Sequence, residues 1–178
     1  MSEHRIEMLV GMAVGVVFGL VLVAVLLKIT KTNGKMKCEY DERQEVLRGR
    51  GFKYGFFVMM FCNLIYALLW IGFGQLPIDT GAYMVLTVVI GVAVYANYCI
   101  WNDCYFSLNE NRPRLMIAFA VIGGSNLIIG LTNLFHGNAI ESGKMNYHGI
   151  NLFCGLLFME IFFALCLRQF RKEEEMEE

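Results

Sequence analysis

Hydrophobic positions dominate the chain in five long runs, which cover residues 8–27, 55–74, 80–101, 115–135 and 149–167. Each run is close to the ~20 residues that an α-helix needs to cross the hydrocarbon core of a bilayer. One long polar segment and three short polar stretches separate the runs. The pattern therefore predicts an all-α integral membrane bundle of five transmembrane helices.

The composition supports this class, because 57% of the residues are hydrophobic and only 17% are charged. An ordinary soluble domain is far less apolar. The spans use up nearly the whole chain, so we expect no separate soluble catalytic domain and no enzymatic activity. Two parts are predicted: residues 1–37, with the first span and a basic turn at 33–34, and residues 38–178, with four spans and an acidic tail.

The placement of Lys and Arg predicts the orientation in the membrane. If the five spans alternate in direction, thirteen of the fifteen basic residues fall on one side. By the positive-inside rule that side is cytoplasmic, which puts the C-terminus in the cytoplasm and the N-terminus outside. The first run has 20 unbroken apolar residues, more than the ~7–15 of a signal-peptide core, so we expect a retained span in the cell membrane.

The polar segment 38–54 carries a dense alternation of acids and bases. Tyr40, Leu47 and Tyr54 recur every seven residues, which predicts a cytoplasmic juxtamembrane helix before the second span. Gly49 and Gly51 would allow a bend between the surface and the membrane. The segment is either a solvated connector or a docking site for a partner, whose candidate residues are Tyr40, Asp41, Glu42, Arg43, Arg48 and Arg50.

Two groups of polar motifs carry a resemblance to known proteins. The first is Tyr40-Asp41-Glu42-Arg43-Gln44 with Arg48-Gly49-Arg50, and the second is Trp101-Asn102-Asp103 with Tyr105-Phe106-Ser107-Leu108-Asn109-Glu110. Over roughly residues 38–135 the chain resembles an uncharacterised group of small multi-pass bacterial membrane proteins. The resemblance implies a membrane topology and no catalytic residue.

A stripe of small residues marks the first span. Gly11, Gly15 and Gly19 follow at four-residue spacing, so they lie on one face of a helix. Such a stripe lets a second helix approach closely in lipid. That second helix belongs either to a membrane protein partner or second copy, or to this protein's own bundle.

A weak internal repeat relates the second and fourth spans. A shift of 63 residues without gaps gives seven identities in 19 positions, including Asn63-Leu64-Ile65 against Asn126-Leu127-Ile128. We infer two helical hairpins of the same orientation, residues 55–101 and 115–167, related by a pseudo-two-fold axis along the membrane normal. Parallel repeats of this kind occur in transporters and also in proteins that transport nothing.

Glu160 is the most costly residue inside a predicted span. A charged side chain near the bilayer centre costs about 2.5–3.5 kcal/mol on insertion scales. With Asn63, Asn97 and Asn126 it would form an intramembrane polar cluster that binds a cation or relays a proton. The alternative is that these side chains hydrogen-bond across helices and fix the packing.

Other chemistry has little support in the sequence. His136, His148, Glu141 and Asp79 could meet in a metal site, but their spacing matches no ligand motif. We therefore predict no metal and no cofactor, and the short basic segment beside lipid does not indicate nucleic acid. Two functions are carried forward: a non-enzymatic interaction or accessory protein, and a small cation or solute transporter or channel that uses Glu160.

Overall fold

The computed structural model describes residues 3–32 and 38–177, so the basic turn predicted at 33–34 lies outside the described residues. Each of the five long helices contains a stretch long and apolar enough to cross a membrane. The structure is mostly helical, as predicted, and it has five candidate spans and one small two-stranded sheet. The helices are α1 (Glu3–Thr30), α2 (Glu42–Phe73), α3 (Thr80–Trp101), α4 (Arg112–Phe135) and α5 (Ile150–Glu177).

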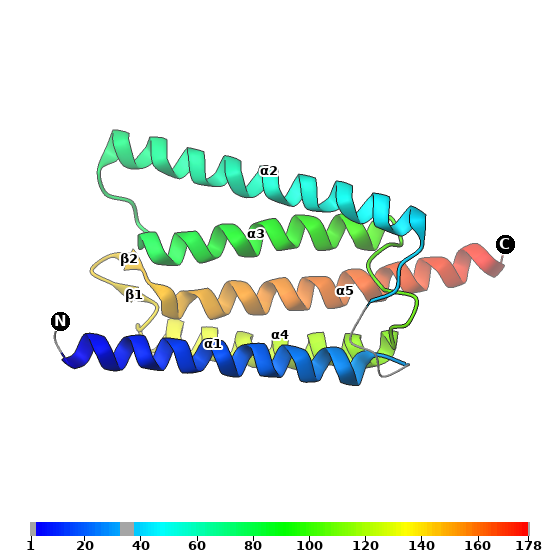
Figure 1. Ribbon diagram of the computed structural model, residues 1–178. Coiled ribbons are helices and arrows are strands. Elements are labelled where there is room, and N and C mark those ends of the chain that lie inside the picture. Colours follow the sequence, from blue (N-terminus) through cyan, green and yellow to red (C-terminus); the bar gives the residue numbers. More distant parts are fainter. Residues whose placement is uncertain (1–2, 33–37, 178) are drawn as a thin grey trace.

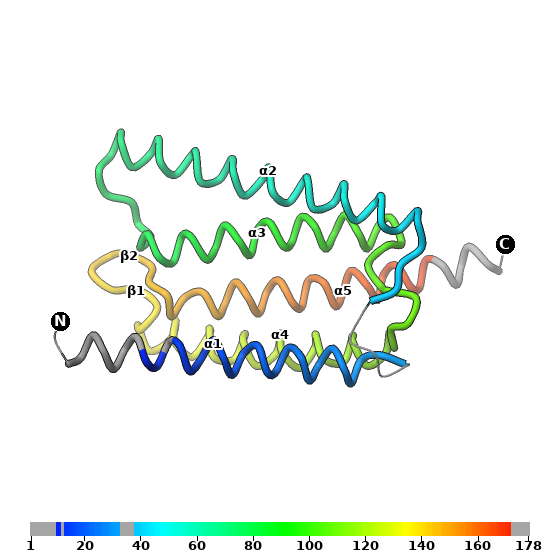
Figure 2. Tube along the Cα trace, in the orientation of Figure 1, coloured from blue at the N-terminus to red at the C-terminus, as the bar shows by residue number. Residues whose placement is uncertain are grey.

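The four later helices lie side by side in the order α2, α3, α5, α4, and α1 runs along α4 (Figures 1 and 2). Between α4 and α5, a two-stranded β-hairpin of β1 (Ile140–Glu141) and β2 (Lys144–Met145) is followed by the 3-10 turn η1 (Tyr147–Gly149). The central pair, α3 and α5, runs in the same direction and forms the core of the bundle. Its buried residues are Ala96, Ile100, Leu157, Ile161, Ala164 and Leu165.

Glycines set the close helix crossings in this bundle. A Cβ added at Gly55 of α2 would lie 2.7 Å from the carbonyl oxygen of Gly91 of α3. A Cβ added at Gly155 of α5 would lie 2.6 Å from the amide nitrogen of Leu127 of α4. Side chains at these positions would force the backbones apart, so glycine is what allows both hairpins to pack tightly.

The helix predicted before the second span is present, but it is not a separate element. Helix α2 runs without a break from Glu42 to Phe73 and therefore includes most of the polar segment. The bend expected at Gly49 and Gly51 is absent because Gly51 is buried against the Tyr95 and Tyr98 rings of α3. That contact, one turn before the Gly55 crossing, keeps the start of α2 in line with its apolar part.

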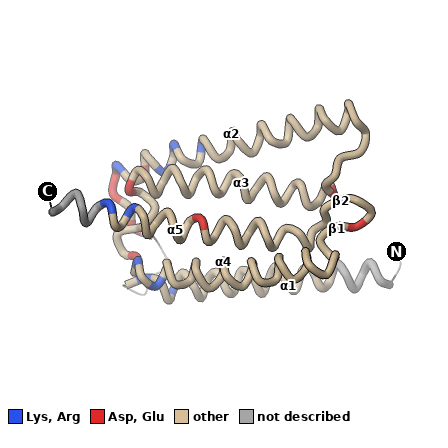
Figure 3. Tube along the Cα trace, turned by 180° about the vertical axis from the view of Figure 1, so that it is seen from behind, with Lys and Arg blue, Asp and Glu red and all other residues tan. Residues whose placement is uncertain are grey.

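Charged residues gather at the end of the bundle where α1, α3 and α5 finish and where α2 and α4 begin (Figure 3). We call this the basic end. Lys144 of the β-hairpin lies at the opposite end. The described Lys and Arg side chains of the basic end are Lys28, Lys31, Arg43, Arg48, Arg50, Lys53, Arg112, Arg114, Arg168 and Arg171.

We expect Gly155→Ala to destabilise the protein by about 1–3 kcal/mol, because the new methyl group would overpack the α4–α5 crossing. Gly124→Ala on α4 is the matched control, since a Cβ there meets nothing within 4 Å. It should be neutral or stabilise by up to about 1 kcal/mol through helix propensity. Thermal unfolding in mild detergent measures both, and equal midpoints for the two variants would contradict this account of the crossing.

Candidate functional site at the basic end

The α3–α4 loop, residues 102–111, is the meeting point of the basic end. It receives hydrogen bonds or ion pairs from the residues after α1, from the polar segment that opens α2, and from the last part of α5. The two motif groups of the sequence, residues 40–50 and 101–110, therefore lie in direct contact. We call this set of contacts the loop hub.

A buried ion pair stands at the centre of the loop hub. The Lys31 side chain is fully buried and its Nζ lies 3.0 Å from Oε1 of Glu110, whose side chain is 7% exposed. The same Nζ lies 2.8 Å from Oγ of Ser107 and 3.1 Å from Sγ of Cys38. An ammonium group has three donors, and here each of them has an acceptor.

The ionisation of Lys31 follows from these contacts. Burial alone would lower the pKa of its ammonium group, because the charged form loses hydration. The hydrogen bonds to Cys38 and Glu110, together with the charge of Glu110, outweigh burial and raise the pKa above its ordinary value. Lys31 is therefore held as a cation and serves as a fixed charge, in contrast to a catalytic lysine whose pKa is lowered.

The backbones of Lys31 and Glu110 also pair with each other, in a short β-bridge beside the ion pair. The amide of Thr32 donates to the carbonyl of Asn109 at 3.0 Å, and the amide of Asn111 donates to the carbonyl of Thr30 at 2.7 Å. The C-terminal end of α1 is thus fixed to the loop that joins α3 to α4.

Gln44 links the start of α2 to the loop hub. It forms a capping box with Asp41, whose side chain accepts a 2.6 Å hydrogen bond from the Gln44 amide. The Gln44 side-chain amide also donates to the Phe106 carbonyl at 3.2 Å. One residue therefore caps α2 and positions the loop.

Arg48 makes the second link from α2. Its guanidinium group donates to the carbonyls of Cys104 and Tyr105 at 3.1 and 3.2 Å. The same group lies 4.0 Å from the centre of the Tyr40 ring, within the range of a cation–π contact. Of the predicted docking segment, Arg48 therefore holds the loop, Tyr40 packs against Arg48, and Asp41 caps α2.

The remaining predicted docking residues face outward. Glu42, Arg43 and Arg50 are exposed and line an open groove of about 470 Å³, together with Val46, Leu47 and Asn102. We call this surface the α2 groove. Its mixture of acidic, basic and apolar side chains is typical of the polar rim of a protein interface.

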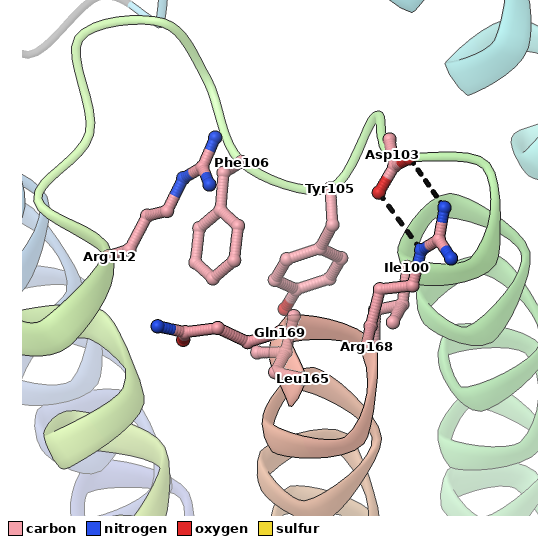
Figure 4. Close-up of a pocket in the computed structure, with 8 residues that line it drawn as sticks. All are labelled: Ile100, Asp103, Tyr105, Phe106, Arg112, Leu165, Arg168 and Gln169. Atoms are coloured by element: carbon pink, nitrogen blue, oxygen red, sulfur yellow. Dashed lines mark hydrogen bonds and ion pairs between the residues drawn. The ribbon is translucent and has the colours of Figure 1, made fainter. Parts of the chain in front are cut away.

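The end of α5 closes the loop hub on its other side. Arg168 forms a bidentate ion pair with Asp103, with nitrogen–oxygen distances of 2.7 and 3.1 Å (Figure 4). Next to this pair is a cavity of about 70 Å³, between the loop, α4 and α5. Its lining consists of Ile100, Asp103, Tyr105, Phe106, Arg112, Leu165, Arg168 and Gln169.

The three asparagines of the predicted intramembrane cluster form hydrogen bonds within their own helices. The amide groups of Asn63, Asn97 and Asn126 each donate to the carbonyl four residues earlier in their own helix, at 2.8–3.0 Å. Asn63 also reaches Oγ1 of Thr87 at 3.4 Å. Glu160 is exposed on α5, and within 3–32 and 38–177 no hydrogen bond joins any two of the four residues.

The glycine stripe of α1 does not face the bundle. A Cβ added at Gly11, Gly15 or Gly19 would meet nothing within 4 Å. At Gly55 and Gly155, in contrast, an added Cβ would clash with the neighbouring helix. The face that Gly11, Gly15 and Gly19 define is open at these three positions of α1.

The proposed metal ligands at the opposite end have other contacts. Asp79 caps the N-terminus of α3 and accepts a 2.9 Å hydrogen bond from the Gly81 amide. Nδ1 of His136 lies 2.8 Å from the carbonyl oxygen of Thr132. Among the described side chains there is no group of three or more His, Cys, Asp or Glu residues that could hold a metal ion.

Sequence reasoning did not identify Lys31, Gln44, Ser107 or Arg168 as partners within the loop hub. Lys31 and Glu110 are 79 residues apart, so no local pattern connects them. One signal was present: Lys31 lies four residues after the first apolar run, and Ser107 and Glu110 lie in a polar motif predicted on the same side of the membrane.

Comparison with known proteins gave no match among family models, curated proteins or solved structures. The function is therefore argued from the geometry of this chain.

We expect Lys31→Met to destabilise the protein by about 3–5 kcal/mol, because it leaves the Glu110 carboxylate buried without its cation. The double variant Lys31→Met/Glu110→Met should recover much of this loss, since both charges are then absent. Lys28→Met, at an exposed position one turn earlier, is the control and should change stability by less than about 0.5 kcal/mol.

Unfolding of the purified protein by denaturant in detergent measures these differences. A Lys31→Met variant as stable as the Lys28→Met control would contradict the role of the buried ion pair.

Proposed function

We propose that the protein is a multi-pass cell-membrane protein with a non-enzymatic interaction or accessory role, which docks a membrane partner through the glycine face of α1 and the α2 groove. The observation that carries this proposal is the open glycine stripe on α1. Small residues in a membrane helix normally allow close packing of another helix. Nothing in the described bundle occupies this face.

The membrane orientation in this proposal rests on charge. Among the described basic side chains, all lie at the basic end except Lys144, which lies at the opposite end. The positive-inside rule favours the basic end in the cytoplasm, which places the N-terminus outside and the C-terminus inside. Exposed apolar side chains over all five helices would then contact lipid.

The loop hub provides a physical connection between the two proposed docking surfaces. Helix α1 is fixed to the α3–α4 loop through Lys31, and the start of α2 is fixed to the same loop through Gln44 and Arg48. A partner that displaces α1 would therefore act on contacts that also hold the α2 groove. For such a coupling, the partner must bind two arrangements of the loop hub with different affinities.

The order α2, α3, α5, α4 supports the proposed parallel repeat. It places the second helix of each hairpin at the centre and the first helix at the edge, as a two-fold axis between α3 and α5 would. The repeat is thus proposed as the origin of the four-helix bundle, with α1 added to it. It gives no preference for transport, because duplicated hairpins also serve as scaffolds.

The alternative, a small cation or solute transporter centred on Glu160, has less support. It needs Glu160 and the three asparagines to converge on a polar path, whereas Glu160 is exposed and the asparagine amides bond within their own helices. The interaction role uses an open surface that is present, so we favour it.

We expect Gly15→Leu to abolish most of the crosslinking between α1 and its partner in native membranes, because a branched side chain would prevent close approach of helices. Val17→Leu is the control, since it adds one methylene at an exposed position of α1, rotated ~200° from Gly15. Chemical crosslinking followed by mass spectrometry identifies the partner band. A band that persists in Gly15→Leu would exclude the glycine face as the docking surface.

A further inference from the structure

Helix α5 presents an uncovered seam that alternates in steps of four and three residues. Its apolar members are Leu156, Phe163, Leu167 and Phe170, with 51, 55, 61 and 65% of their surface exposed. The fifth member, Glu160, is exposed as well. This 4-3-4-3 spacing is the a/d pattern of two helices that pack side by side with knobs in holes.

The rest of α5 is already used by the bundle. Ile161, Ala164 and Leu165 belong to the buried core with α3. Gly155 and Met159 meet Leu127 and Gly123 of α4. The seam is therefore the face of α5 that neither neighbouring helix covers.

The position of Glu160 argues against a seam that is covered by lipid alone. It lies eight residues before Arg168, roughly 12 Å along the helix axis at 1.5 Å per residue. In the membrane placement proposed above, that position is within the hydrocarbon. Ionisable side chains at such depth almost always face a bundle interior or pair with another polar group, and here the described bundle supplies none.

We infer that the seam is the contact surface for a second copy of this chain, in a parallel dimer of α5 helices. A two-fold axis along the membrane normal brings equal depths together, so each seam residue meets its own counterpart. Glu160 then faces Glu160 of the other copy. A carboxyl group can both donate and accept a hydrogen bond, so the two facing Glu160 side chains are polar partners for each other.

The pattern also explains why a single polar residue lies in an otherwise apolar seam. In packed helix pairs, one polar residue at an a position fixes register and oligomeric state. Glu160 has this place between Leu156 and Phe163. Transmembrane helices commonly cross at about +20°, the angle that this spacing fits.

This inference rests on the membrane placement and is independent of the partner proposed for α1. The two contacts use different helices: the glycine face of α1 and the seam of α5. Loss of one contact would leave the other intact, so their tests are distinguishable.

The test is oxidative crosslinking of single cysteine variants in native membranes. Leu156→Cys and Phe163→Cys place thiols on the seam, and Val121→Cys places one on an exposed part of α4, 64% exposed and nine residues from the start of that helix. The wild-type chain, with its six free cysteines, sets the baseline. We expect a band of twice the chain mass for the two seam variants and only the baseline for Val121→Cys.

A second measurement addresses Glu160 itself, by energy transfer between labelled copies at decreasing protein-to-lipid ratio. Glu160→Gln retains a self-complementary amide and should retain the dimer, whereas Glu160→Leu should weaken it by roughly three- to thirty-fold. The inference is overturned if seam and Val121→Cys variants crosslink equally, if seam thiols crosslink to a different protein, or if Glu160→Leu associates as tightly as Glu160→Gln.

Discussion

Burial of the Lys31 ammonium group is the constraint on which the basic end depends. A buried cation without partners would cost several kcal/mol, so the chain must bring acceptors to it. Two segments do so: Cys38, and the α3–α4 loop with Ser107 and Glu110. The backbone of the same loop also forms the β-bridge with Lys31. The loop is consequently held in one conformation from several sides.

Helix α1 therefore has two regions that differ in how tightly they are held by the rest of the protein. Its C-terminal end is fixed by the ion pair and the β-bridge, whereas along its length it packs only lightly on α4 and leaves its glycine face open. The four other helices pack through glycine crossings and a shared core. The protein is therefore a compact four-helix bundle with a fifth helix fixed at one end, which is compatible with the proposal that α1 packs on a partner.

The helices could be predicted from the sequence because long apolar runs allow few other structures in lipid. The contacts between the helices and the loops could not be predicted in this way. The Lys31–Glu110 pair joins residues 79 positions apart, and only the folded chain shows which loop meets which helix end. The hydrogen bonds of the asparagines could not be predicted either, since a mid-helix amide can bond to its own backbone, as Asn97 does. The bend that Gly51 would allow does not form, because packing against α3 outweighs the flexibility of glycine.

Hydrogen exchange of the backbone amides in bilayers tests the central claim most directly. If the buried Lys31 ion pair organises the basic end, the amides of Thr32, Leu108 and Asn111, which donate across the loop hub, exchange slowly in the wild-type protein. In the Lys31→Met variant they should exchange much faster, while amides within α3 stay protected. Fast exchange at these three amides in the wild-type protein, or unchanged exchange in Lys31→Met, would contradict the account.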